Sequence, residues 1–541
     1  MNESGDDACL PNAPSCTVRD AFPSPFSFAA LIFGVVIVNV VDTMSYLVIG
    51  LGALAAYYVV SSITAWYRLR HFKGPFLASF SYLWMVKVVL SGQAWRTHFD
   101  NRKKYGEPLI RIGPDVLITD DADIVRRMNA ARSPYRRSYW YNAFRADPFF
   151  HSMVSTQDEQ YHSDIKTRTN PAYSGREVPS MESDIDDRVH DLKNLIRRGY
   201  LSTNSETKPL DLAAVLQWFT LDVITKLAFG QEWGYLTTQT DVYSFISAFE
   251  QFASFMALCC DIPWFQWLFF SRPAVMLVGP KPTDEWGFGK MIAITKQVTT
   301  KALRDGGDQP TMMGSFIRHG LNQQQLEAEI PLVVVAGSDT TAGVIRGTLL
   351  YILSTPRVYQ RLQEEIDDAL RTKKVTTNPI SVTEAKPLPY LQAVIYEGCR
   401  IHPPNQILIL KEVPPEGDTL LGRYAVPGGT KIGVNVLGMM RDERVFGADA
   451  DVFRPERWLG LDPNRRLEME RHAELIFGHG RYMCAGKTVA FMELNKIFFE
   501  VCLLSSFPNI TDASSSCFAI SISKSCTPKL PGGNASTRAS S

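Results

Sequence analysis

Residues 477–486 read FGHGRYMCAG, and a helical pattern follows directly after them. A cysteine that binds a metal as thiolate needs backbone N–H donors and positive potential around its sulfur, because the free thiol stays protonated near neutral pH. A helix that begins just after Cys484 supplies both. Gly478, Gly480 and Gly486 permit tight turns and let a flat macrocycle approach the backbone. The stretch therefore predicts that Cys484 ligates a heme iron; the alternative is a buried, inert cysteine.

A second motif, AGSDTT, begins at Ala336 inside the long helical pattern of Gln324–Ser354. Ala336 and Gly337 are small enough to leave room for dioxygen. Thr340 offers a hydroxyl and Asp339 an acid that can pass protons. Such a polar run is often only a solvated helix face, but apolar residues on both sides bury this one. A buried acid usually has a function or a paired partner, so we predict a proton-delivery role for this motif.

These two motifs resemble the heme-binding loop and the oxygen-binding helix of the cytochrome P450 superfamily. The chain is similar to its microsomal fungal type, the pisatin demethylase-like and benzoate 4-monooxygenase-like branch. The resemblance covers about residues 74–526, and it includes Phe477 at the start of the heme-binding loop. It implies a mainly α-helical fold with small β-sheets, and heme b (iron protoporphyrin IX) between the Thr340 helix and the Cys484 loop.

Three charged residues match the structural triad of the same family. Glu397 and Arg400 are three apart on an expected helix and can pair, although such pairs are common on exposed faces. The stretch FRPERW, residues 453–458, follows before the cysteine loop. The resemblance implies that Glu397, Arg400 and Arg457 form a buried network that holds the loop under the heme.

The residues that bind the heme propionates are less well defined by the sequence. Two residues before the cysteine, where relatives commonly carry a basic residue, this chain has Tyr482, preceded by Arg481; either side chain is a candidate. His162 and Lys166 lie one helical turn apart where the family often has tryptophan and arginine, and a solvated helix face fits them equally. Lys411 takes the place of another basic ligand, with a surface lysine as the alternative.

The N-terminal region predicts a membrane anchor. An uncharged stretch at 44–65 matches the roughly 20 residues that span a bilayer. Interfacial aromatic residues and then basic residues follow it, which places the rest of the chain in the cytosol. The earlier apolar run, Phe28–Val41, is too short to span alone and is expected to end at Asp42. We expect a single-pass protein of the endoplasmic reticulum with a lumenal tail (1–27), an anchor (28–66, spanning helix about 44–65) and a catalytic domain (67–541).

Composition excludes other classes of protein. Lysine plus arginine equals aspartate plus glutamate at 56 each, so charge gives no reason to expect nucleic acid as a partner. The nine cysteines contain no CxxC pair and no metal-finger spacing. The end of the chain, 531–541, has a composition typical of disorder.

The periodicity predicts helices over most of the chain after residue 180, with small sheets. Helices are expected at 212–229, 324–354 and 356–371. A hairpin is expected at 109–119, and further strands at 407–413, 420–436 and 518–522.

The resemblance implies an enzyme that uses dioxygen and electrons from NADPH to oxidise an apolar small molecule, in fungal secondary metabolism. Electrons would come from a separate membrane-bound NADPH-cytochrome P450 reductase, with cytochrome b5 as a second donor. By analogy the substrate pocket is lined by 133–150, 248–270, the residues before 336, 405–410 and the turn near 518. The alternatives are a heme-thiolate isomerase or dehydratase without a reductase, a heme sensor, and oxidative detoxification of plant or xenobiotic aromatics.

Overall fold

The computed structural model describes residues 25–505, apart from 146, 148, 201–205, 207 and 405. It divides into an N-terminal unit that ends at Thr64 and a large unit that begins at Ala65. The predicted N-terminal tail up to residue 24, the strand at 518–522 and the C-terminal tail at 531–541 lie outside the described residues.

The first helix, α1, runs without interruption from Pro25 to Leu69. Its segment Val48–Leu69 is long and apolar enough to cross a membrane, with a mean hydropathy of 1.7. The helix continues through Asp42, the residue at which the apolar run Phe28–Val41 ends. An aspartate inside a helix costs less than about 1 kcal/mol relative to alanine, far less than a proline, so it does not end one.

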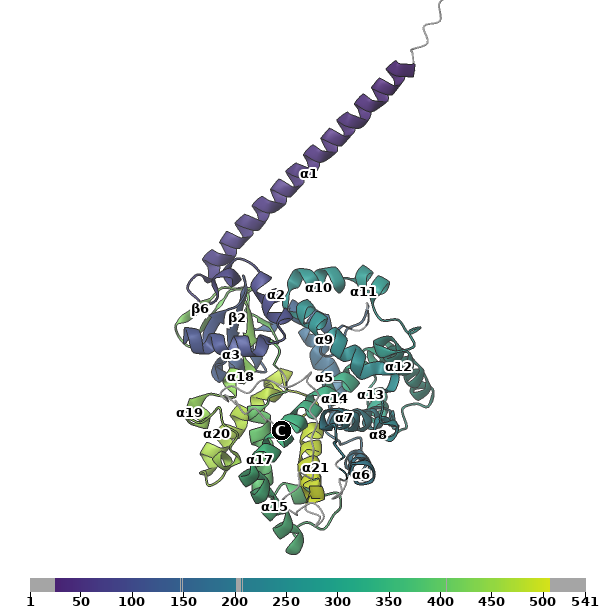
Figure 1. The fold of residues 1–541 in the computed structure, drawn as a ribbon, viewed down its shortest axis with the longest axis vertical. Helices are drawn as coiled ribbons and strands as arrows, with labels where there is room; N and C mark the ends of the chain where they lie inside the picture. The colour runs from purple at the N-terminus through teal and green to yellow at the C-terminus, as the bar shows by residue number, and fades with distance from the viewer. Residues whose placement is uncertain are drawn as a thin grey trace, which may run out of the picture. The chain divides into compact units, whose positions relative to one another are not determined.

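Most of the large unit is helical (Figure 1). Its helices are α2 (Leu83–Leu90), α3 (Ala94–Tyr105), α4 (Ala122–Asn129), α5 (Glu159–Tyr173), α6 (Met181–Gly199), α7 (Leu212–Phe229), α8 (Tyr235–Thr238), α9 (Phe245–Asp261), α10 (Pro263–Phe269), α11 (Arg272–Val278), α12 (Gly287–Arg304), α13 (Met312–Arg318), α14 (Gln323–Ser354), α15 (Pro356–Arg371), α16 (Val382–Ala385), α17 (Pro389–Ile401), α18 (Val436–Met439), α19 (Glu443–Phe446), α20 (Pro463–Ala473) and α21 (Lys487–Ser505).

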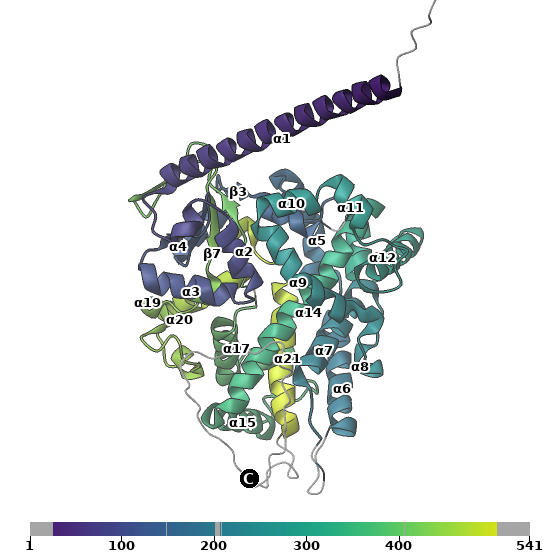
Figure 2. The ribbon, with the colours of Figure 1, turned by 45° about the horizontal axis from the view of Figure 1, so that its top comes forward.

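Helix α14 packs along α7 through the middle of the large unit (Figure 2). It begins at a capping box in which Asn322 and Gln325 satisfy each other's backbone N–H groups. It ends before Pro356, which opens α15 at the first helical position. The predicted helices at 212–229 and 356–371 are confirmed, and the one at 324–354 is longer by one residue.

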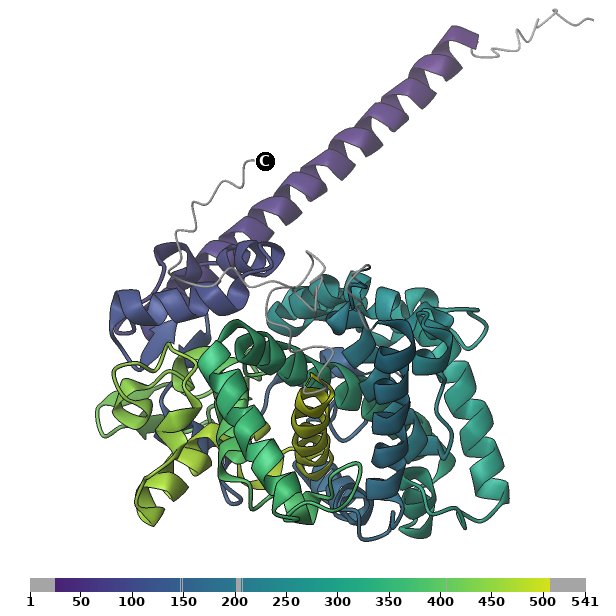
Figure 3. The same cartoon turned by 60° about the horizontal axis from the view of Figure 1, so that its bottom comes forward.

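Helix α21, which follows the cysteine loop, lies between helices from both halves of the large unit. Figure 3 shows it as the yellow helix flanked by green and blue ones. It contacts α6 on one side and α15, α16 and α17 on the other, and it also packs on α14. The loop before α21 is therefore anchored to the core of the fold.

The strands form one sheet in the order β1-β2-β7-β4-β3 and a separate β5-β6 pair. Their bounds are β1 (Leu109–Arg111), β2 (Val116–Thr119), β3 (Arg136–Arg137), β4 (Lys411–Glu412), β5 (Asp418–Leu420), β6 (Tyr424–Val426) and β7 (Lys431–Val434). The hairpin at 109–119 is confirmed: β1 and β2 are antiparallel, with Leu109 opposite Thr119. Strands β2 and β7 are far apart in the sequence but pair in parallel, with Val116 opposite Lys431.

The strands predicted at 407–413 and 420–436 are much shorter in the structure. Within 407–413 only β4 is extended and paired, and three short strands, β5 to β7, occupy 418–434. Pro414, Pro415 and Pro427 separate these strands, and a proline removes the N–H that a continuous ladder needs.

Candidate active site

The loop of Cys484 closes on itself. The backbone N–H of Cys484 donates to the carbonyl of Phe477 at 2.6 Å, just before α21 begins. The sulfur is reachable by solvent although protein surrounds it closely. Burial raises the pKa of the Cys484 thiol, while the backbone N–H groups of Gly486 and Lys487 and the ammonium of Lys166 oppose that rise. The predicted helix start and its donors are thus present at the sulfur.

Two of the loop glycines have conformations that other residues adopt rarely. Gly478 has φ +77° and Gly480 has φ +56°. A Cβ on Gly480 would lie 2.3 Å from the carbonyl oxygen of Asn129, at the end of α4. Glycine is therefore required where the cysteine loop approaches α4.

The structure brings the predicted triad together in the core. Glu397, Arg400 and Arg457 are all buried, with exposed side-chain fractions of 0%, 0% and 2%. Arg400 binds Glu397 bidentately, with both N···O distances 2.8 Å, and Arg457 Nε lies 3.0 Å from Glu397 Oε1. Burial opposes ionisation, but Arg400 and Arg457 outweigh it and hold the pKa of Glu397 below its usual range.

The triad also ties together the chain that precedes the cysteine loop. Arg400 donates to the carbonyls of Met440, Ala450 and Val452. Sequence reasoning missed two further members. Asp449 pairs with Arg457 at 3.0 Å, and the indole N–H of Trp458 donates to Glu397 at 3.0 Å. Trp458 directly follows Arg457 in the sequence, which is a usable signal; Asp449 becomes a partner only through the fold.

A cluster of buried basic groups lies beside the loop. His162, Lys411 and Arg481 each carry a buried nitrogen without a hydrogen-bond partner among the described residues. Burial, followed by the charges of Arg137, Lys166, Lys411 and Arg481, lowers the pKa of His162 to about 3. Basic side chains with unpartnered buried nitrogens fit a ligand that carries carboxylates.

Arg481 of this cluster and the neighbouring Lys166 donate hydrogen bonds to backbone carbonyls of the protein. Lys166 donates to the carbonyls of Arg481 and Met483 at 2.8 and 2.6 Å, so it holds α5 to the cysteine loop. Arg481 donates to the carbonyl of Ser133 at 2.9 Å and lies 3.7 Å from Glu159. Lys411 Nζ and His162 Nδ1 have no hydrogen-bond partner among the described residues and can bind a ligand.

The third part of the site is the AGSDTT turn of α14. The Thr340 hydroxyl donates to the carbonyl of Ala336 at 2.9 Å, one turn back. Ala336 is exposed although Val334 and Ser338, on either side of it, are buried. The small side chain of Ala336 therefore faces open space from an otherwise buried stretch of α14. The nearby Thr340 hydroxyl can exchange its present acceptor for another one.

A family model described as Cytochrome P450 matches residues 74–512. The chain belongs to the cytochrome P450 family. It is 46% identical over 460 residues to "Cytochrome P450 monooxygenase ABA1" of Pyricularia oryzae, covering 84% of this chain and 90% of that relative. It is 45% identical over 439 residues to "Cytochrome P450 monooxygenase aba1" of Botryotinia fuckeliana, with 80% and 85% covered. The protein "Cytochrome P450 monooxygenase abl1" of Leptosphaeria maculans is 40% identical over 443 residues, with 81% and 77% covered.

Family membership makes this protein a monooxygenase with heme b as its cofactor. The residues present fit that group: a cysteine with N–H donors at its sulfur, and buried cations without acceptors beside it. Sequence reasoning missed Arg137 of β3, which is buried and lies over the rings of Tyr141 and Tyr482 at 4.8 and 5.2 Å. Nothing in its local sequence marks it, because its neighbours come from distant segments.

Gly337 of this P450 faces α7 rather than open space. A Cβ built on Gly337 would lie 2.6 Å from Cγ1 of Ile224. The missing side chain therefore allows close packing of α14 on α7.

Substituting Gly337 by valine is expected to destabilise the P450 by about 1–3 kcal/mol, because Ile224 must move. Unfolding midpoints in urea would measure the effect. Gly343 on the same helix is the matched control, since a Cβ there would meet nothing within 4 Å. Gly343→Ala should not lower the midpoint, and Ile224→Ala should restore part of the loss. An unchanged midpoint in Gly337→Val would contradict the packing argument.

Asp339 lies 3.7 Å from Arg346, two helical turns later on α14. The predicted burial of Asp339 is only partial, because 49% of its side chain is exposed. Desolvation by the surrounding protein still raises the pKa of Asp339, and Arg346 counteracts the rise. Both residues line a cavity of about 440 Å³ between α7, α9 and α14, within the size range of ligand pockets. Phe249 and Ala253 of α9, which belong to the stretch 248–270, line it together with residues of α7.

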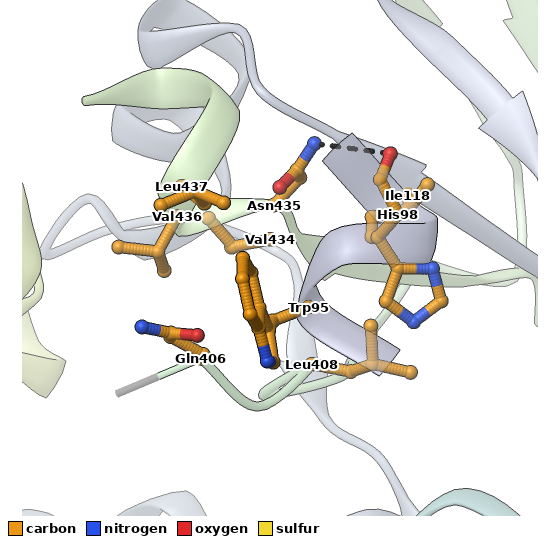
Figure 4. A pocket seen from close by; sticks show the side chains of 9 residues that line it. All are labelled: Trp95, His98, Ile118, Gln406, Leu408, Val434, Asn435, Val436 and Leu437. Atoms are coloured by element: carbon orange, nitrogen blue, oxygen red, sulfur yellow. Dashed lines mark hydrogen bonds between the residues drawn. The ribbon is translucent and has the colours of Figure 1, made fainter. Parts of the chain in front are cut away.

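A second cavity lies between α3, β7 and the segment 406–408 (Figure 4). Trp95, Gln406 and Leu408 are among its lining residues, and the Asn435 amide donates to the carbonyl of His98 at 3.4 Å. Its volume of about 10 Å³ holds at most one water. It is too small for a substrate, although it touches the stretch 405–410 predicted to line the pocket.

Proposed function

We propose that this P450 oxidises an apolar small molecule of fungal secondary metabolism at the cytosolic face of the endoplasmic reticulum membrane. Electrons would come from NADPH through a separate NADPH-cytochrome P450 reductase, with cytochrome b5 as a second donor. The observation that carries the proposal is the combination of the Cys484 loop with an intact alanine-acid-threonine turn at Ala336, Asp339 and Thr340. A heme-thiolate protein that only binds a ligand does not need that acid and hydroxyl.

Heme, when bound, supplies the chemistry of oxygen activation at an iron held by the cysteine sulfur. Cys484 would be the ligand, with the backbone N–H groups at the start of α21 stabilising its thiolate. His162 and Lys411 would face the propionates, because their nitrogens have no other acceptor among the described residues. Glu397, Arg400 and Arg457 would keep the loop in place.

Protons would reach the site along α14. Asp339 opens on the 440 Å³ cavity, which reaches polar residues of α7 and α9 and can admit water. Its raised pKa lets the carboxyl hold a proton at higher pH than an ordinary aspartate. Thr340 follows directly in the helix, and its hydroxyl can exchange the carbonyl of Ala336 for another acceptor.

Two features of the chain support membrane association. One is the apolar segment Val48–Leu69 of α1. The other is the pair α10 and α11, which follow one another along the chain and contact each other (Figure 1). Both helices expose large apolar side chains. Those side chains are Trp264, Trp267, Leu268, Met276, Leu277 and Val278. Exposed apolar patches of this kind mark interaction surfaces, and lipid suits one rich in tryptophan.

Microsomes containing this chain and a reductase would test the proposal. A panel of terpenoids, polyketides and alkaloids would be screened for NADPH and oxygen consumption and for products gaining one oxygen atom. Turnover that requires both NADPH and reductase supports it. Turnover of a peroxide without NADPH would indicate an isomerase or dehydratase, and binding without turnover a sensor. Exclusive turnover of plant or xenobiotic aromatics would indicate detoxification.

A further inference from the structure

Lys411 is a buried lysine whose amino group has no acceptor among the described residues. The residue is 1% exposed on β4, in the middle of the large unit. Its ammonium has no hydrogen-bond partner among the described residues. Burial, and then the charge of Arg137, lower the pKa of Lys411 well below its usual range; Glu159 opposes this and Arg481 adds to it. Because burial favours the neutral amine, Lys411 can act as a cation only if a neighbouring group stabilises its positive charge.

The ring of Tyr482 lies directly against that ammonium. Lys411 Nζ is 2.9 Å from the ring centroid. The same ring has Arg137 at 5.2 Å, Arg481 at 5.6 Å and the His162 ring at 5.4 Å from its centre. The face of an aromatic ring attracts cations, and most strongly where water is excluded.

Tyr482 contributes this attraction without a charge of its own. A phenol is uncharged at neutral pH, because the ordinary pKa of tyrosine is about 10. A lysine or arginine at this position would add a cation beside Lys411, Arg137 and Arg481. Like charges at such distances repel, and burial strengthens the repulsion.

We propose that Tyr482 is a positioning residue that holds the Lys411 ammonium through its ring face, so that Lys411 can bind a heme propionate. The ring thereby replaces a basic residue two positions before Cys484. This proposal rests on the proposed heme site and names one contact within it.

Heme retention tests the proposal without using enzyme activity. Holoprotein would be mixed with excess apomyoglobin, and the rate of heme transfer followed by absorption. Tyr482→Phe keeps the ring and should release heme within about twofold of the wild-type rate. Tyr482→Leu and Lys411→Met should each release heme about tenfold faster, which corresponds to roughly 1.4 kcal/mol. The double variant should be no faster than either single one, because both remove the same contact.

A charge exchange provides a second, independent test. Tyr482→Lys should release heme faster than Tyr482→Phe in the wild-type background, because it places a cation beside Lys411. In the Lys411→Met background the same lysine should slow release again. If Tyr482→Leu yields no holoprotein, this comparison decides the matter.

Three results would overturn the proposal: wild-type release from Tyr482→Leu, fast release from Tyr482→Phe, or a double variant whose effect is the product of the single ones. Fast release from Tyr482→Phe would assign the contact to the hydroxyl instead. A normal reduced carbon monoxide spectrum in the variants before transfer shows that the Cys484 site itself is intact. Failure of the Tyr482 contact is then distinguishable from failure of the heme-thiolate assignment.

Discussion

Arg457→Ala is expected to destabilise the folded protein by about 3–5 kcal/mol and to abolish stable heme incorporation. The substitution leaves Glu397 with one guanidinium fewer at complete burial, and it removes the contacts to Asp449 and to the carbonyls of Phe446 and Val452. These contacts hold the segment before the cysteine loop. Heme content per polypeptide and the urea unfolding midpoint would measure both effects.

Arg371→Ala is the matched control, because it removes an arginine from an ion pair on the surface. Arg371 lies 2.5 Å from Asp368 with 76% of its side chain exposed. Such pairs contribute little, so heme content and midpoint should stay near wild type. Well-folded holoprotein from Arg457→Ala would contradict the structural role assigned to the triad.

Asp339→Asn is expected to lower the turnover number by about 100-fold or more, since general acid–base steps contribute 10²–10⁴. The amide keeps the shape of the carboxyl but cannot release and regain a proton at neutral pH. Heme content should remain unchanged, because the partner of Asp339 is Arg346 on the same helix and not the cysteine loop. Steady-state product formation with the reductase, and its solvent isotope effect, would measure the change.

The proton-delivery role of Asp339 also predicts how the pH dependence of turnover should shift when Arg346 is replaced. Arg346 lowers the pKa of Asp339 against the effect of burial, so Arg346→Gln should raise that pKa further. The carboxyl would then stay protonated to higher pH, and the limb of the pH profile that belongs to it should move upward. Arg346→Lys keeps the charge and should leave the profile in place. Unchanged turnover in Asp339→Asn would rule out this route.

Local patterns explain how far the sequence predicted the fold. Helices such as 212–229 and 356–371 have strong apolar periodicity and clear end signals, and the structure confirms their bounds. Asp42 ends the apolar run Phe28–Val41 but not the helix, because a single charge counts against membrane insertion more than against helix formation. Strands at 407–436 were predicted too long, because pairing partners rather than propensity decide where a short strand ends.

The site residues likewise divide into those that local sequence indicates and those that depend on distant parts of the chain. The spacing of Glu397 and Arg400 shows that they can share a helix face, but only the family resemblance implied that they form a buried network with Arg457. Arg137, Asp449 and Arg346 could not be found, because each becomes relevant only through neighbours from other parts of the chain or through a cavity. Gly337 was noted for its size, but only the packing against Ile224 shows which neighbour requires it.

The central claim is that Cys484 is the thiolate ligand of the heme iron. It is tested most directly by the absorption spectrum of the reduced carbon monoxide complex, which is red-shifted when a thiolate donates to the iron. The wild-type protein should show the red-shifted band, and so should Cys399→Ala, which removes a buried cysteine elsewhere. Cys484→Ala should lack the band. Retention of the band in Cys484→Ala, or its absence from the wild-type holoprotein, would contradict the account.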